Sequence, residues 1–218
     1  MNVYLIRHTE VSVGRQIAYG QSDVDLTDTY HEQLDRLKKH LPDGLLLPHP
    51  TVIFSSPLRR CRQLANDLAS VLTAGSPIET APGQTAVVDA QRPRVQIDDR
   101  LKELFFGDWE LVPWADINPE ELAAWRADFV GIRMPNGENF QDLYERITTF
   151  WNEQILPLAE ANSQQSVFIV SHGGVIRALL CLFMELPLSN AYRINLDYGA
   201  VSRLTMSGSS YTIQYINR

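Results

Sequence analysis

Three short apolar runs recur along this chain, each about as long as one buried strand. They occupy residues 3–6, 52–55 and 167–171. Segments with apolar residues at helical three- and four-residue spacing separate them, and this alternation is typical of a mostly parallel sheet covered by helices on both faces. We therefore expect an α/β fold, a three-layer α/β/α sandwich with a mostly parallel central sheet.

The segments around these runs predict further elements. One helix is expected from Pro57, a favourable first-turn residue, to Leu72, and another over residues 140–155. The aromatic residues of the second helix recur at helical spacing, which favours packing in the core over a ligand platform. Runs at 192–196, 201–205 and 211–215 predict strands, and the last two predict an antiparallel hairpin at the edge of the sheet.

The length of 218 residues fits a single domain that spans residues 1–218. Residues 73–94 are rich in Gly, Pro, Thr, Ala and Gln and show little periodicity, so we expect a surface excursion there. A net charge of −7 argues against a surface for nucleic acid or anionic membranes, because both need clustered Lys and Arg.

Two further features bear on the location of the protein and its thiol chemistry. The first strand begins near Asn2 and no apolar stretch has the length of a membrane span, so we expect a cytoplasmic protein. Cys61 and Cys181 lie in expected helices without CxxC spacing, which favours buried thiols over a disulfide or a structural metal site.

Two of the apolar runs end in histidines. Arg7 and His8 follow the first run, and His172 follows the third. Parallel strands present their carboxyl ends at one edge of the sheet, so these side chains are expected to converge. Arg7 is suited to holding phosphate oxygens and His8 to acting as a nitrogen nucleophile. An isolated histidine would more often cap a strand or pack under a loop, so the pairing with His172 is the informative feature.

A second cation is expected from the segment that follows the middle run. Arg60 lies near the start of the expected helix, whose first-turn amides favour an anion, and it is a candidate phosphate clamp. Adjacent residues on a helix point in different directions, so Arg59 and Arg62 are expected to face water.

Carboxylates stand among bulky apolar residues at positions 101–110, where apolar surroundings favour a proton on the carboxyl group. Glu103 is the candidate proton donor, with Asp108 and Glu110 as competitors. Arg177 is expected to brace a carboxylate or face solvent, and Glu138 in its Pro-Asn-Gly-Glu turn is at least as well explained as a cap of the next helix.

Four separated motifs in this order resemble the histidine phosphatase superfamily, also called the phosphoglycerate mutase-like family. They are Arg7-His8-Thr9-Glu10, Ser55-Ser56-Pro57-Leu58-Arg59-Arg60, Glu103-Leu104-Phe105-Phe106-Gly107-Asp108-Trp109-Glu110 and Ser171-His172-Gly173-Gly174.

The resemblance implies a phosphoglycerate mutase-like fold and a role for each candidate residue. His8 becomes phosphohistidine, Arg7 and Arg60 bind the phosphoryl group, and His172 completes the catalytic pocket and contacts the phosphoryl oxygens. Glu103 protonates the leaving group and then activates water. The implied reaction needs no metal and no cofactor, and the implied partner is a small phosphorylated metabolite.

Three segments, 19–24, 105–110 and 134–140, most resemble the α-ribazole phosphatases within the superfamily. This implies hydrolysis of α-ribazole 5′-phosphate to α-ribazole and phosphate during assembly of the cobalamin nucleotide loop. The chain departs from the common pattern at Thr9, Tyr30 and Leu64, and at Gly14, where many members carry an Asn that helps to hold phosphate.

Other functions stay open at this point. The same motifs are compatible with a phosphatase of another small phosphometabolite, with a phosphoglycerate mutase, and with an inactive protein that binds a phosphorylated ligand. The sequence does not fix the oligomeric state.

Overall fold

The central sheet joins segments from both ends of the chain. We describe the protein from a computed structural model, which describes residues 1–41, 51–73, 78–81, 84–86, 93–161 and 165–218. Its six-stranded sheet has the order β10-β9-β1-β8-β3-β6. The strands are β1 (Asn2–Arg7), β3 (Thr51–Ser55), β6 (Arg94–Ile97), β8 (Ser166–Ser171), β9 (Val201–Ser207) and β10 (Ser210–Tyr215).

The register of the parallel strands places the predicted site residues side by side. β1 and β8 run parallel with Arg7 opposite Ser171, and β3 runs parallel to β8 with Ser55 opposite Val170. The residues that follow these three strands therefore emerge together at one edge of the sheet. Antiparallel β9 and β10 close the other side, which confirms the predicted edge hairpin.

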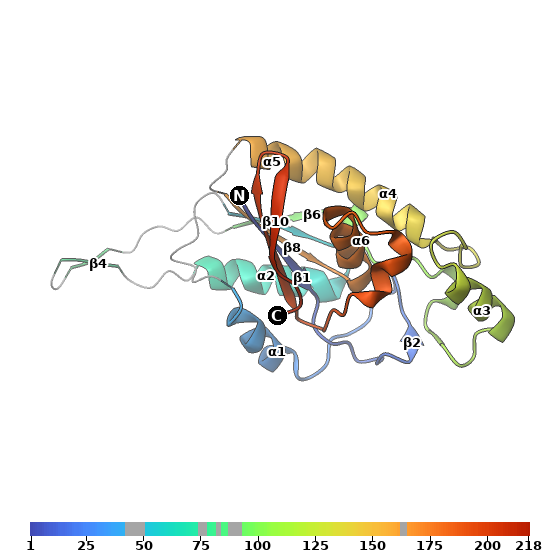
Figure 1. The fold of residues 1–218 in the computed structure, drawn as a ribbon. Helices are drawn as coiled ribbons and strands as arrows, with labels where there is room; N and C mark the ends of the chain where they lie inside the picture. Colours follow the sequence, from blue (N-terminus) through green and yellow to red (C-terminus); the bar gives the residue numbers. More distant parts are fainter. Residues whose placement is uncertain (42–50, 74–77, 82–83, 87–92, 162–164) are drawn as a thin grey trace.

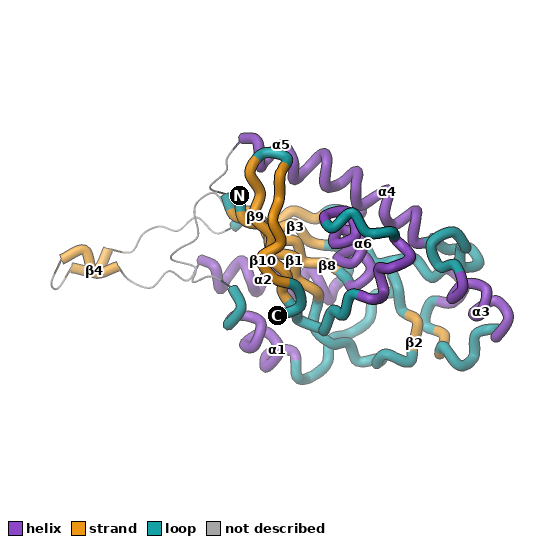
Figure 2. Tube along the Cα trace, in the orientation of Figure 1, coloured by secondary structure: helices purple, strands orange, loops and turns teal. Residues whose placement is uncertain are grey.

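Alternate residues of the buried strands face two different cores. Val3 and Leu5 belong to one apolar cluster, whereas Tyr4 and Ile6 belong to the other. This two-residue period is expected when both faces of a sheet are covered. Figures 1 and 2 show the covering layers, with α1 (Tyr30–Lys38) and α2 (Arg59–Thr73) on one side of the sheet. The opposite side is covered by α4 (Phe140–Phe150), α5 (Leu156–Ala161) and α6 (Gly173–Phe183).

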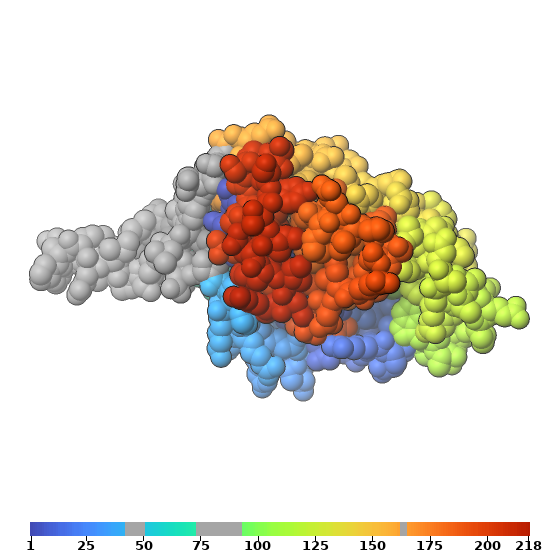
Figure 3. All heavy atoms as spheres, viewed as in Figure 1, coloured from blue at the N-terminus to red at the C-terminus, as the bar shows by residue number. Residues whose placement is uncertain are grey.

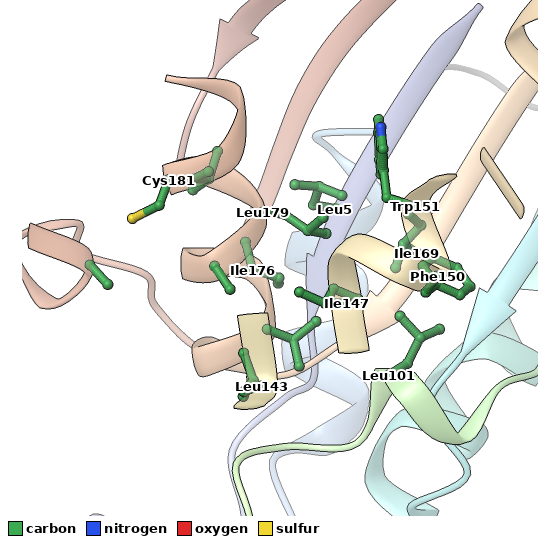
Figure 4. Packing of buried hydrophobic residues seen from close by; sticks show 14 of the residues in the cluster. Leu5, Leu101, Leu143, Ile147, Phe150, Trp151, Ile169, Ile176, Leu179 and Cys181 are labelled. Atoms are coloured by element: carbon green, nitrogen blue, oxygen red, sulfur yellow. The ribbon is translucent and has the colours of Figure 1, made fainter. Parts of the chain in front are cut away.

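The larger core lies between α4, α6 and the sheet. Figure 4 shows Leu143 and Ile147 of α4 gathered with Leu5 and Ile169 of the strands and with Leu101, which ends the 3₁₀ helix after β6. All five are fully buried, which confirms that the apolar stripe of this helix serves the core. The three-layer α/β/α sandwich predicted from the sequence is therefore the observed fold.

Two expected helices differ in detail from the observed ones. The first helix begins at Arg59, two residues after Pro57, because the carbonyl oxygen of Leu58 is the first acceptor of its ladder. The second helix extends to Ala161 and passes through a π-helical turn at Trp151–Ile155.

The predicted strand at 192–196 was wrong. A 3₁₀ helix spans Leu188–Arg193, and the chain beyond it does not join the sheet. Its carbonyl groups are occupied by side chains instead, because Arg177 donates to Ile194 at 3.0 Å and Arg7 donates to Leu196 at 2.5 Å.

Smaller elements lie outside the central sheet. β2 (Ile17–Ala18) pairs with β7 (Val112–Pro113), and α3 (Pro119–Ala127) lies at one end of the molecule, where Figure 3 shows its yellow-green atoms (Figures 1 and 3). Within the predicted excursion, β4 (Ile78–Ala81) and β5 (Gln84–Ala86) form a separate hairpin, and the rest of its loops lie outside the described residues.

Both thiols are buried and free, as expected. In the part of the chain that the structure describes, no helix has the length and apolar character needed to cross a bilayer.

Candidate active site

The two predicted histidines meet at the carboxyl edge of the sheet. The ring centroids of His8 and His172 are 5.1 Å apart, and their side chains are 1% and 0% exposed. The backbone N–H of His8 donates to the carbonyl oxygen of Ser171, so the loop after β1 is joined directly to the end of β8. The convergence predicted from the strand ends is therefore observed.

The His8 ring is prepared to act as a nucleophile. Its Nδ1 lies 2.7 Å from the carbonyl oxygen of Thr9, a contact that requires a proton on Nδ1 and leaves the lone pair on Nε2. Burial, followed by the positive charges of Arg60 and Arg7, lowers the pKa of His8 well below its ordinary value of 6.5. The ring is therefore neutral at physiological pH.

His172 is held in place by neighbours on α2 and the loop before it. Its Nε2 is 2.8 Å from the hydroxyl oxygen of Ser56, and Arg60 Nε donates to its Nδ1 at 3.3 Å. These contacts define a tautomer with the proton on Nε2. The sulfur of Cys61 packs against the same ring at 3.4 Å. Burial and then the charge of Arg60 lower the pKa of His172 as well.

Only one of the three neighbouring arginines on α2 enters this region. Arg60 is fully buried and donates to the carbonyl oxygens of Ser22 and Gly20 at 2.8 and 2.5 Å. Arg59 and Arg62 are exposed, as predicted. The backbone N–H of Arg59 already donates to the carboxylate of Asp23, so a side chain occupies the anion position at this helix start.

Arg7 carries a buried donor with no partner. Its Nη1 donates to Leu196, but its Nε is buried and has no hydrogen-bond partner among the described residues. A buried donor without an acceptor costs about 1–3 kcal/mol, so this position favours a bound acceptor. Its guanidinium carbon lies 4.0 Å above the ring of Tyr198, a residue that sequence analysis did not single out.

The Glu103 side chain contacts the N-terminus of α6. Both carboxylate oxygens accept from the backbone N–H of Gly174 at 3.1 Å, and one also accepts from Leu104. A Cβ at residue 174 would come within 2.4 Å of the Glu103 carboxylate, so a larger residue there would displace this carboxylate. The Glu103 carboxylate therefore occupies the backbone amide at the N-terminus of α6.

A cavity of about 510 Å³ opens beside Glu103 and Arg7. It joins the two candidate site residues to a wall of aromatic side chains. Its remaining lining consists of Leu104, Phe106, Trp114, Trp125, Arg126, Phe129, Gly173, Gly174, Arg177 and Tyr192.

Comparison with known proteins identifies the family of this chain. The model of the histidine phosphatase superfamily (branch 1) matches residues 3–83 and 79–218. The chain belongs to this superfamily. It is 30% identical over 184 residues to the adenosylcobalamin/alpha-ribazole phosphatase of Escherichia coli (strain K12), which covers 80% of this chain and 88% of the relative.

Two other histidine phosphatase relatives illustrate the range of the family. The glucosyl-3-phosphoglycerate phosphatase of Mycolicibacterium vanbaalenii is 29% identical over 194 residues, covering 85% of this chain and 75% of its own. The crystal structure of the alpha-ribazole phosphatase from Shigella flexneri superposes with a TM-score of 0.75 at 27% identity, covering 100% of this chain and 96% of that one.

The competing carboxylates of this histidine phosphatase have other partners. Glu110 accepts from the backbone N–H groups of Gln21, Ser22 and Phe106, so it fixes the loop before the site. Asp108 accepts from Asn136 and does not line the cavity. Of the three candidate carboxylates, Glu103 alone lines the cavity.

Several contributors to the site were missed or misjudged from the sequence. Arg177 lines the cavity and donates to a carbonyl group, where we expected a carboxylate partner or solvent. The guanidinium group of Arg7 lies over the Tyr198 ring, and that of Arg60 lies over the Tyr19 ring. The hydroxyl oxygens of the two tyrosines lie 2.9 Å apart. Tyr19 belongs to the segment 19–24 that resembles the α-ribazole phosphatases, but no local pattern in the sequence indicates that Tyr198 lies next to Arg7.

Among the described residues, no three His, Cys, Asp or Glu side chains gather closely enough to hold a metal ion. The expectation of a reaction without metal stays a prediction.

Proposed function

We propose that this histidine phosphatase is a phosphomonoesterase that acts through a phosphohistidine intermediate on His8. The observation that carries the proposal is the neutral His8 ring, whose Nδ1 proton is engaged by Thr9 and whose Nε2 lone pair remains beside two arginines. An inactive binding protein would need the cations but not this prepared nucleophile.

The proposed reaction has two steps. Nε2 of His8 forms a bond to phosphorus while the bond to the ester oxygen breaks, and Glu103 gives its proton to the departing alkoxide. Water then attacks the phosphohistidine as Glu103 takes a proton from it, which releases phosphate and restores the protonated carboxyl group. Arg7 and Arg60 hold the phosphoryl oxygens and stabilise the charge that develops on them, and His172 joins them by turning its Nε2 hydrogen from Ser56 to a phosphoryl oxygen.

The cavity supports a substrate with a planar, apolar leaving group. Trp114 and Trp125 stack with their ring centroids 6.1 Å apart and an interplanar angle of 20°. Trp125 lines the cavity, and its indole N–H is buried without a hydrogen-bond partner among the described residues. α-Ribazole 5′-phosphate carries a planar benzimidazole with a ring nitrogen acceptor, and it is the substrate we propose.

A substrate panel tests this function. We expect phosphate release from α-ribazole 5′-phosphate, in the presence of a chelator, with a kcat/KM at least about 10-fold above that for phosphoserine or 3-phosphoglycerate. The variant W114L should lower kcat/KM for α-ribazole 5′-phosphate and leave that for phosphoserine unchanged. A preference for 3-phosphoglycerate would discard the substrate, and release from no compound would discard the phosphatase.

A further inference from the structure

Arg146 of α4 uses every hydrogen of its guanidinium group. Nε and Nη2 donate to the two carboxylate oxygens of Glu138, each at 3.0 Å. Nη1 donates to the carbonyl oxygens of Arg100 and Lys102 at 2.5 and 2.7 Å, and Nη2 donates to that of Glu103 at 2.9 Å. A guanidinium group has five N–H donors, so the set is complete. The side chain is 18% exposed, which limits competition from water.

Glu138 adds hydrogen bonds to the backbone on the C-terminal side of Glu103. Its carboxylate accepts from the backbone N–H of Phe105 at 3.0 Å, and its own N–H donates to the carbonyl oxygen of Phe105 at 2.9 Å. The sequence also suggests Glu138 as a cap of α4, but Asn139 and Asp142 form the capping box there. The ion pair is thus directed at the backbone of residues 100–105.

The Glu103 segment is also anchored through its apolar side. Leu101 is fully buried in the cluster that Leu143 and Ile147 of α4 build, as Figure 4 shows. One helix therefore holds this segment by packing and, through Arg146, by hydrogen bonds. Neither Arg146 nor Glu138 lines the cavity.

We infer that Arg146 and Glu138 are positioning residues that set the location of the Glu103 carboxyl group. The inference rests on the proposed function, in which Glu103 is the proton donor. On its far side the carboxylate is held by the Gly174 amide, which donates to both of its oxygens at 3.1 Å. A small displacement of the backbone therefore moves the proton away from the departing oxygen, and misplacement of this kind is costly for catalysis.

Two aryl-bearing substrates separate proton donation from every other requirement of the site. Benzyl phosphate releases a basic alkoxide that needs a proton, whereas p-nitrophenyl phosphate releases a weakly basic phenolate that does not. Both carry one aromatic ring for the same cavity. The variant E103Q sets the reference, because it should lower kcat/KM for benzyl phosphate far more than for p-nitrophenyl phosphate.

The test variants keep the size of each side chain. R146K retains the charge but not the planar fork, and E138Q retains the shape but not the charge. We expect each to lower kcat/KM for benzyl phosphate by about 10- to 100-fold and that for p-nitrophenyl phosphate by less than about 3-fold.

The matched control is R133K. Arg133 forms an ion pair with Asp142 at the start of the same helix, but it is 59% exposed and none of its hydrogen bonds reaches residues 100–105. This variant should leave both activities unchanged. Thermal unfolding of all variants shows whether each one is folded at the assay temperature.

The outcomes separate the inference from the proposed function. Selective loss on benzyl phosphate in E103Q, R146K and E138Q supports both. Selective loss in E103Q alone, with equal losses or none in the other two, overturns the positioning role and leaves the function intact. No hydrolysis by the native protein, or no selectivity in E103Q, overturns the proposed chemistry and the inference together.

Discussion

At the scale of single residues, His8 and His172 link the site to the pH dependence of stability. Burial lowers both pKa values below 6.5, so the folded protein leaves these rings neutral while the unfolded chain binds protons below about pH 6.5. Stability should therefore fall as pH drops below that value, by up to about 1.4 kcal/mol per pH unit for each ring. We expect H8N to abolish phosphate release and to reduce this slope, measured by urea unfolding between pH 7 and pH 5.

The control for this prediction is H31N. His31 is an exposed residue on α1, so its replacement should leave the pH slope unchanged. An unchanged slope in H8N would mean that the folded protein protonates His8 as readily as the unfolded chain does.

At the scale of elements, the start of α4 supports both the core and the ion pair on Arg146. Asn139 accepts from the backbone N–H of Asp142 at 2.9 Å, and Asp142 accepts in return from that of Asn139. We expect N139A to lower the free energy of unfolding by about 1–2 kcal/mol, because the first turn of the helix loses its acceptor. Denaturant unfolding measures the loss. N118A, which removes the cap of peripheral α3, should cost less, and an equal cost would contradict a special role for α4.

At the scale of the whole molecule, the site joins β1, β8, α2 and the Glu103 segment, which are far apart in the sequence. An anion that binds all four should stabilise the fold as a unit, by about 2.7 kcal/mol at 100 times its Kd. We expect orthovanadate to raise the melting temperature of the native protein and of H8N, whose cations are intact. R7Q should lose most of the increase, and a full increase in R7Q would place the anion elsewhere.

The sequence predicts those parts of the molecule whose signals are local. Strands at 3–6, 52–55 and 167–171 are recognisable because both faces are buried, and helix geometry predicts that Arg59 and Arg60 cannot both enter the site. The sequence at 192–196 predicts a strand that does not form, because Arg7 and Arg177 donate hydrogen bonds to its carbonyl oxygens in the folded protein. The role proposed for Arg146 has no local signal either, since the backbone oxygens that it contacts are more than 40 residues away.

The aromatic wall and the histidine pair belong to separate parts of the architecture. His8 and His172 follow central strands that are buried on both faces, where almost any substitution disturbs packing. Trp114, Trp125 and Phe129 lie outside the sheet and pack on one another and on the edge of the larger core. Evolution can therefore exchange one substrate for another by rebuilding the wall while the inherited strand ends keep the same chemistry, and a protein engineer can follow the same route.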